Sequence, residues 1–156
     1  MNKNQSCLIF NRMRNMLTVV AESVQSHTVA GIGGLIQSNG ALNLTGQTAT
    51  LDNANTLAQQ ISIDTATLSN KSGRITQTGI NANNIKASTM LDNTSCTIAS
   101  NSNTTFTVGN LVNQAGSIQA AGCLATCFAN LTVNATGAID NSVLNGIAGE
   151  YKQANH

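Results

Sequence analysis

The amino-acid sequence predicts an all-β fold, a right-handed parallel β-helix (solenoid) of about five or six coils over residues 33–145. The main observation is a repeated phrase that consists of Asn, two free positions, a small residue, one free position and Ile. Its copies are Asn70–Ile75, Asn93–Ile98, Asn113–Ile118 and Asn134–Ile139. The asparagines are separated by 23, 20 and 21 residues, and Asn53 lies a further 17 residues upstream. A period near twenty is typical of a solenoid, in which each coil buries its apolar face by stacking on its neighbours.

Composition supports the same fold. The 156 residues include no proline, 8 % charged and 3 % aromatic residues, and 22 asparagines, which suits a solenoid with outward faces of uncharged polar side chains. Disorder is the competing interpretation of so polar a chain, but the regular apolar positions argue against it. The length fits one domain, and a net charge of +1 gives no electrostatic reason to expect nucleic-acid binding.

The first 26 residues differ in kind from the rest. Lys3, Arg12 and Arg14 precede the first acid, Glu22, and apolar residues cluster between them. One interpretation is a targeting leader that takes no part in the fold. The other is an amphipathic helix over residues 8–21 that caps the first coil.

The stretches between copies of the phrase alternate apolar and polar residues at the period of a β-strand. This is seen in Ala41–Leu44, Gln60–Ile63 and Thr105–Val108. None of these runs has helical spacing. We therefore expect each coil to be built from strands, with alternate side chains facing the interior.

Each position of the phrase has a predicted role. The asparagines suit a bend, because Asn tolerates left-handed backbone angles, and their amides can bond from coil to coil. The small residues permit a close approach of the backbone after that bend. The Ile residues, and a Leu two residues before most of the asparagines, face inward. The predicted structural positions are Asn53, Asn70, Asn93, Asn113, Asn134, Gly73, Gly116, Gly137, Ile75, Ile98, Ile118 and Ile139, with Cys96 among the glycines.

A catalytic role would require reactive groups that meet on one face. Asp52 and Asp92 each precede a phrase asparagine, which predicts one shared position two coils apart with no basic partner; they are interpreted as surface turn residues. His27 and His156 lie outside the coils. We expect no catalytic residues, cofactor or metal.

The four cysteines are Cys7, Cys96, Cys123 and Cys127. Residues four apart in an extended strand are about 13 Å apart, too far for a disulfide between Cys123 and Cys127. Buried small side chains are the preferred interpretation, and a break in the strand near Thr126 is the alternative.

Residues 146–156 are expected to form a tail over the last coil. Only Glu150 and Lys152 are charged there, and no proline is present to block strand addition. Because the usual protections of a sheet edge are sparse, we expect self-association through the ends of the β-helix.

The leader and the repeats both resemble filamentous haemagglutinins, which are two-partner-secretion exoproteins. In the leader the matching residues are Met1–Lys3, Ile9–Arg12, Arg14, Leu17 and Val19–Glu22, which resemble an extended signal peptide region. In the coils, stretches such as Gly116–Gly122 and Leu91–Asn93 resemble the haemagglutinin repeats. The resemblance covers nearly the whole chain. It implies a secreted or cell-surface fibre that carries adhesin or toxin regions away from the cell.

The resemblance also implies partners, and it shows which secretion features of the family are absent from this sequence. In the family, an outer-membrane transporter reads a secretion domain with Asn-Pro motifs, and the fibre meets a host or neighbouring-cell surface. This chain has no proline, and residues 26–34 contain no apolar signal core. The resemblance therefore implies a truncated fragment in which a leader precedes a few stalk repeats, and it leaves export of this chain open.

The expected function is thus structural: a β-helical stalk fragment of a filamentous haemagglutinin-like adhesin or contact-dependent inhibition exoprotein, and no enzyme. A carbohydrate-active β-helix, similar to a polysaccharide lyase or hydrolase, is the alternative from another class, and a non-functional gene remnant is a third. The discriminating feature is whether acids of neighbouring coils meet in one groove.

Overall fold

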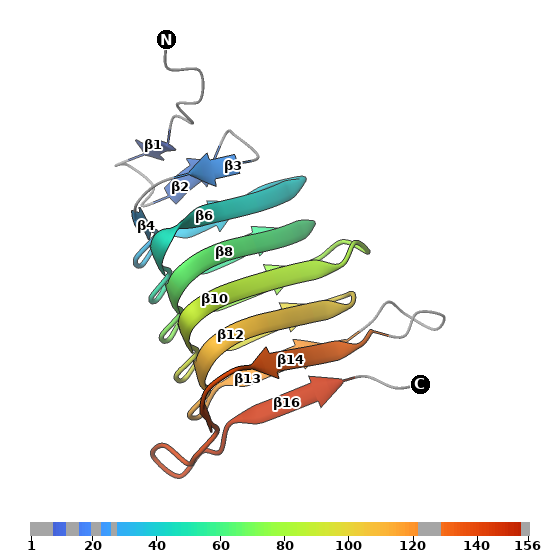
Figure 1. Ribbon diagram of the computed structural model, residues 1–156. Helices are drawn as coiled ribbons and strands as arrows, with labels where there is room; N and C mark the ends of the chain where they lie inside the picture. Colours follow the sequence, from blue (N-terminus) through green and yellow to red (C-terminus); the bar gives the residue numbers. More distant parts are fainter. Residues whose placement is uncertain (1–7, 12–15, 20–22, 26–27, 122–128, 154–156) are drawn as a thin grey trace.

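The chain forms a right-handed parallel β-helix of about five coils, as predicted from the repeated phrase (Figure 1). The computed structural model describes residues 8–11, 16–19, 23–25, 28–121 and 129–153. Every regular element among these residues is a β-strand. A helix long and apolar enough to cross a membrane is absent from the described part of the chain.

Each central coil contributes one strand to each of two sheets, and the coils at the two ends contribute two shorter strands to one of them. The long-strand sheet comprises β3 (Ser23–Gln25), β4 (Thr28–Ala30), β6 (Ala41–Thr50), β8 (Gln60–Ser69), β10 (Asn83–Asp92), β12 (Thr104–Val112), β14 (Leu131–Ala135) and β15 (Ile139–Asp140). The short-strand sheet comprises β1 (Leu8–Asn11), β2 (Met16–Val19), β5 (Leu35–Gln37), β7 (Asn55–Ala58), β9 (Arg74–Gln77), β11 (Thr97–Ser100), β13 (Ser117–Ala120) and β16 (Glu150–Gln153). All neighbouring strands run parallel except β1 and β2, which are antiparallel.

The register places like residues above one another, and we call such a set a column. Ile63 pairs with Ile85 and Ile85 with Phe106, while Ile75 pairs with Ile98 and Ile98 with Ile118. These side chains are buried, because alternate residues of a strand face the interior and parallel pairing repeats that choice in every coil. Burial of the predicted inward residues is confirmed for Leu42, Leu44, Ile61, Ile63, Phe106, Val108, Leu51, Leu68, Leu91, Leu111, Ile75, Ile98 and Ile118.

Differences in coil length are absorbed where strands meet. Gln59 alone separates β7 from β8, whereas residues 78–82 separate β9 from β10. The buried Gln77 holds this longer connection: its Nε2 donates to the Gln59 carbonyl at 2.7 Å, and its Oε1 accepts from the Ser100 hydroxyl at 2.7 Å. A bulge between Ala87 and Met90 adds a further residue to the same coil. The apolar columns therefore continue in register through the coil with the longest phrase spacing.

The alternative of a helix in the leader is wrong for the described residues. The described residues of 1–26 form β1, β2 and β3, and β2 pairs in parallel with β5 while β3 pairs with β6. The open edge of the first coil offers backbone hydrogen-bond partners that a strand can use and a helix cannot. The leader strands β2 and β3 therefore extend the two sheets, and β1 lies beside β2 in antiparallel orientation.

The expected division at residue 145 also differs from the structure. Residues 150–153 form β16, which pairs in parallel with β13 and adds another strand to the short-strand sheet. The region predicted as a covering tail is therefore partly a stacked strand of the solenoid, and its outer side becomes the edge of that sheet (Figure 1).

Candidate functional site

A ladder of asparagine side chains runs through the solenoid at the end of the long strands. Asn70 Nδ2 donates to Asn93 Oδ1 at 3.0 Å, Asn93 Nδ2 to Asn113 Oδ1 at 2.7 Å, and Asn113 Nδ2 to Asn141 Oδ1 at 2.8 Å. Asn70, Asn93 and Asn113 are fully buried. Each amide therefore satisfies its neighbour inside the core, which confirms the predicted coil-to-coil bonding at these three positions.

Asn134 was predicted to belong to this ladder, and that prediction is wrong. Asn134 lies within β14, pairs with Thr107 and is exposed. The ladder continues instead through Asn141. Ile139, expected beside Ile118, pairs with Leu111 and is 50 % exposed. The fourth copy of the phrase is thus a coincidence of sequence and not a repeat of the structure.

The longer connection between β13 and β14 explains this difference. β13 ends at Ala120 and β14 begins at Leu131, whereas β11 ends at Ser100 and β12 begins at Thr104, so Asn134 falls within a strand and not at its end. A second insertion follows Asn141. Gly116 follows Asn113 by three residues, whereas the equivalent Gly149 follows Asn141 by eight. The extra residues form a turn in which Leu144 and Ile147 exchange backbone hydrogen bonds of 2.9 and 3.0 Å. The usable sequence signal was Ile139 two residues before Asn141, which is the spacing that Leu68, Leu91 and Leu111 have to their own asparagines.

Asn53 is also not a rung of the ladder. The pairing of Thr50 with Ser69 aligns Leu51, and not Asn53, with Asn70. Asn53 instead aligns with the left-handed residues of the other coils: φ is 56° at Asn53, 52° at Ser72 and 56° at Ser95. The bend predicted at the ladder asparagines therefore lies two residues further on.

The ladder has one unsatisfied end. The preceding coil presents Leu51, which has no polar hydrogen to donate, and Asn70 Oδ1 is buried without a hydrogen-bond partner among the described residues. At the other end, Asn141 Nδ2 donates to the Gly149 carbonyl at 2.7 Å. All the amide donors consequently point toward the C-terminal coils.

Glycines line the ladder where its amides approach the next strand. A Cβ at Gly73 would lie 2.6 Å from both Asn70 Oδ1 and the Leu51 carbonyl oxygen, and a Cβ at Gly116 would meet Asn113 Oδ1 and the Asn93 carbonyl. This confirms the close approach predicted for these two glycines. Gly137 belongs to another place, because its amide bonds to the Gly109 carbonyl at 2.8 Å and its Cβ would meet Asn110.

Cys96 occupies the glycine column between Gly73 and Gly116. Its thiol donates to Asn93 Oδ1 at 2.8 Å and accepts from Asn70 Nδ2 at 3.4 Å, so it forms part of the ladder. Burial raises the pKa of the Cys96 thiol to about 12. Cys7, Cys123 and Cys127 lie outside the described residues, as do His27 and His156.

We expect Cys96 to resist alkylation while the chain is folded, because the thiolate is the reactive form. The folded state holds the thiol proton more tightly than the unfolded state between pH 9.0 and about 12, so the free energy of unfolding falls as pH rises through that range. Mass spectrometry after iodoacetamide treatment at mildly alkaline pH should find Cys96 modified only when guanidinium chloride is present. Equal modification of Cys96 with and without denaturant would contradict its place in the ladder.

The charged residues nearest the ladder are Asp52, Lys71 and Asp92. They do not follow the prediction, because Asp92 pairs with Ser69, whereas Asp52 aligns with Lys71, two positions further along the coil. The predicted lack of a basic partner is also wrong: Lys71 Nζ lies 3.1 Å from Asp92 Oδ2. The first error arises from the register of Asn53, which moves Asp52 with it by two residues. The second arises because the long side chain of Lys71 reaches Asp92 in the next coil.

The hydrogen bonds of these carboxylates favour a role in the turns. Asp52 Oδ1 accepts from the Ser69 hydroxyl at 2.6 Å and from the Lys71 backbone N–H at 2.9 Å. Asp92 Oδ1 accepts from the Thr94 backbone N–H at 3.1 Å. The hydrogen bond with Asp92, and its charge, raise the pKa of Lys71, which keeps the ammonium protonated and makes it a poor general base. Within the described residues, His, Cys, Asp and Glu form no group of three or more placed to hold a metal ion.

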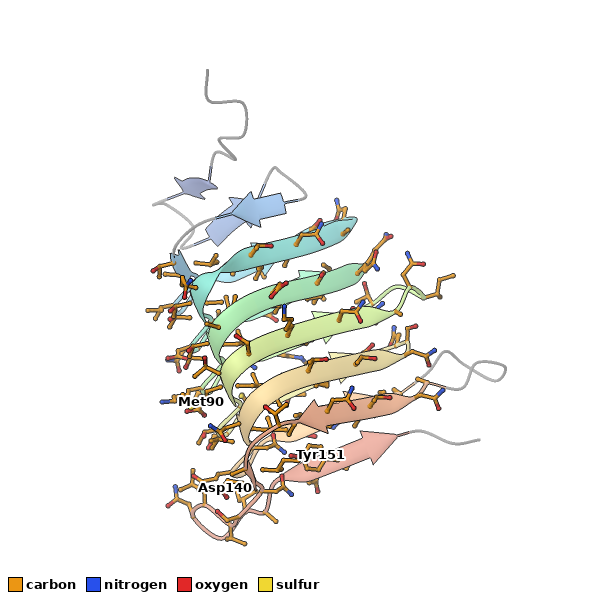
Figure 2. The ribbon with its side chains drawn as sticks, in the orientation of Figure 1. Met90, Asp140 and Tyr151 are labelled. Atoms are coloured by element: carbon orange, nitrogen blue, oxygen red, sulfur yellow. The ribbon has the colours of Figure 1, made fainter. Side chains whose placement is uncertain are left out.

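The outward column of the long-strand sheet is uncharged and polar. Its members are Asn43, Ser62, Asn84, Thr105 and Thr132. The next outward column contains one exposed ion pair, in which Lys86 Nζ lies 3.2 Å from Asp64 Oδ1. Figure 2 shows side chains with oxygen and nitrogen atoms standing along the outer face of the long strands.

Comparison of the chain with protein-family models, with curated proteins and with solved structures found no match in any of the three.

Proposed function

We propose that this protein is a structural and interaction module, a β-helical stalk segment of the filamentous haemagglutinin type. The observation that carries the proposal is the unbroken stacking of coils, in which the interior is occupied by apolar columns and by the asparagine ladder. In a solenoid each coil contacts only its neighbours, so the length is set by the number of coils while the cross-section stays constant. That geometry suits a part that holds other regions at a distance.

The resemblance of the leader and of the repeats supports the same assignment. The proposal includes a secreted or cell-surface location for the parent protein and its passage through an outer-membrane transporter of the two-partner type. The fibre would meet a host or neighbouring-cell surface, with a role in adhesion or in competition between cells. It assigns no catalytic role and no nucleic-acid partner.

The outer surface is better suited to binding another surface than to catalysis. Asp52 and Asp92 are engaged by hydroxyl and backbone donors of the turns, and the outward column from Asn43 to Thr132 offers only hydroxyl and amide groups. Such groups form hydrogen bonds with uncharged polar partners and supply no strong nucleophile or base. The surface therefore favours binding through many weak contacts.

A cell-binding assay tests this proposal. The full chain carrying a fluorescent label should bind to bacterial or epithelial cells in a saturable way, and unlabelled chain should compete. The matched control is the Leu91→Asp variant, which differs at one residue but is expected to unfold, as argued below. Binding of the unaltered chain at the level of this variant on both cell types would contradict the proposal.

A further inference from the structure

The outer edge of the short-strand sheet is formed by β16. Within the described part of the chain, β16 is the last strand of that sheet. The Glu150 amide donates to the Gly116 carbonyl of the coil before, at 2.8 Å. Because successive residues of a parallel strand bond to opposite neighbours, the N–H and C=O of Tyr151 point away from β13. The edge therefore presents a donor and an acceptor from the same residue.

The side chain at this position extends the apolar core. Tyr151 pairs with Ile118 and continues the inward column of Ile75 and Ile98, whose side chains are buried. Tyr151, which is labelled in Figure 2, lies on the last strand of the sheet. Its side chain is 37 % exposed, and Ile139, which ends the Leu68 column, is 50 % exposed. The last coil thus leaves part of each column uncovered, and covering this apolar surface is favourable.

The residues on either side of Tyr151 carry opposite charges. Glu150 and Lys152 lie on the outward face, with 51 % and 58 % of their side chains exposed, and Lys152 Nζ contacts Glu150 Oε2 at 2.6 Å. A second β16 added in antiparallel orientation about Tyr151 would face each Glu150 with a Lys152. Parallel addition in register would face Glu150 with Glu150. The charge pattern is therefore complementary to itself only in the antiparallel arrangement.

We propose that two copies of this chain associate through their β16 strands, antiparallel, with a two-fold axis at Tyr151. The two Tyr151 residues exchange N–H···O=C hydrogen bonds across the axis, as directly opposed residues of an antiparallel pair do. Glu150 and Lys152 then form the adjacent pair without backbone hydrogen bonds, where opposed side chains are closest. The interface uses the same patch on both copies, which is the commonest symmetry of protein dimers.

The opposite end of the sheet does not offer the same partner. There the edge strand is β1, which is antiparallel to β2 and therefore runs in the opposite direction to β16. The polar edge, the uncovered column and the charge pattern coincide only at β16 among the described strands. A closed dimer is therefore expected in preference to an open chain of copies joined head to tail.

Sedimentation of the full chain over a range of concentrations tests the proposal. The mass should rise from 16.1 kDa toward twice that value as concentration increases. The Lys152→Glu variant opposes acids to acids, and Glu150→Lys opposes bases to bases. When each variant is measured alone, its dimer should dissociate at a protein concentration about tenfold higher than the dimer of the unaltered chain does. An equimolar mixture of the two variants restores opposite charges in every pair, and should therefore restore the dimer.

Matched controls separate this interface from general effects of charge. Lys86→Glu changes an exposed ion pair of similar character in the middle of the long-strand sheet, and should leave the dimer unaffected. Circular dichroism of every variant should match that of the unaltered chain, because the changed side chains are exposed. A chain that stays monomeric, variants that dimerise as well as the unaltered chain, or a mixture that stays monomeric would each overturn the proposal.

Discussion

Leu91→Asp is expected to abolish folding of the chain. Leu91 is fully buried, and it pairs with Leu68 on one side and Leu111 on the other. An aspartate there would place a carboxylate between two apolar coils with no basic group in its column. A buried charge without a partner costs about 3–5 kcal/mol of stability, and the loss of the leucine side chain from the core costs about 2–5 kcal/mol more. Small domains have only about 5–15 kcal/mol of stability, so the variant should show no cooperative thermal transition.

The control for this variant lies in the same strand. Asn84 is exposed on the outward face of β10, and Asn84→Asp introduces the same charged group without burying it. Its melting temperature, followed by far-ultraviolet circular dichroism, should stay within a few degrees of that of the unaltered chain, because exposed substitutions change stability little. If the two variants had the same melting temperature, the assignment of inward-facing residues in β10 would be wrong.

Asn93→Leu is expected to be the most damaging substitution in the ladder. It removes one of the two acceptors of Asn70 Nδ2, the acceptor of the Cys96 thiol and the donor to Asn113 Oδ1, and leaves these groups inside the core. Each unsatisfied buried polar group costs about 1–3 kcal/mol, so the free energy of unfolding should fall by about 2–6 kcal/mol. Urea denaturation measures this loss as a lower midpoint.

The same substitution at the first rung provides a sensitive comparison. Asn70 already has an unpartnered Oδ1 and stacks on Leu51, so Asn70→Leu removes that unsatisfied oxygen and adds an apolar contact. Asn93 Oδ1 still accepts from the Cys96 thiol. The free energy of unfolding should therefore change by less than about 1 kcal/mol. Losses of equal size at Asn70 and Asn93 would contradict the direction of the ladder.

The apolar columns could be predicted because they depend on local pattern alone. Ile75, Ile98 and Ile118 follow their asparagines at one fixed distance, since no insertion separates them. The alternation around Leu42 and Phe106 likewise reports which side chains face inward, whatever the neighbouring coil contains. The fold class followed from these two regularities.

The register of the first and last coils could not be predicted in the same way. Asn53 and Asn134 match the phrase by residue type, but coil-to-coil pairing decides register, and pairing depends on turn lengths that the phrase does not contain. Two residues separate Asn53 from the ladder position held by Leu51, and a five-residue insertion delays Gly149 and Tyr151 after Asn141. Hydrogen bonding by residues distant in sequence overrode the local signal.

The two ends were mispredicted for a related reason. Residues 8–25 and 150–153 carry weak local signals, yet strand edges beside them supply a complete row of backbone partners. A segment next to such an edge gains hydrogen bonds by becoming a strand, even where its own pattern suggests a helix or a tail. Prediction from the isolated segment lacks that contribution.

The break of the ladder at Leu51 divides the cooperativity of the solenoid. From Asn70 to Asn141, successive coils are coupled by apolar contacts and by amides that polarise one another. The coil that contains Leu51 has no ladder amide, so it is coupled to the next by backbone pairing, by apolar contact and by hydrogen bonds such as those of Asp52 with Ser69 and Lys71. In a one-dimensional array, local opening begins where nearest-neighbour coupling is weakest. We therefore expect the coils before Asn70 to open at a lower free energy than the coils joined by the ladder, and the latter to open together.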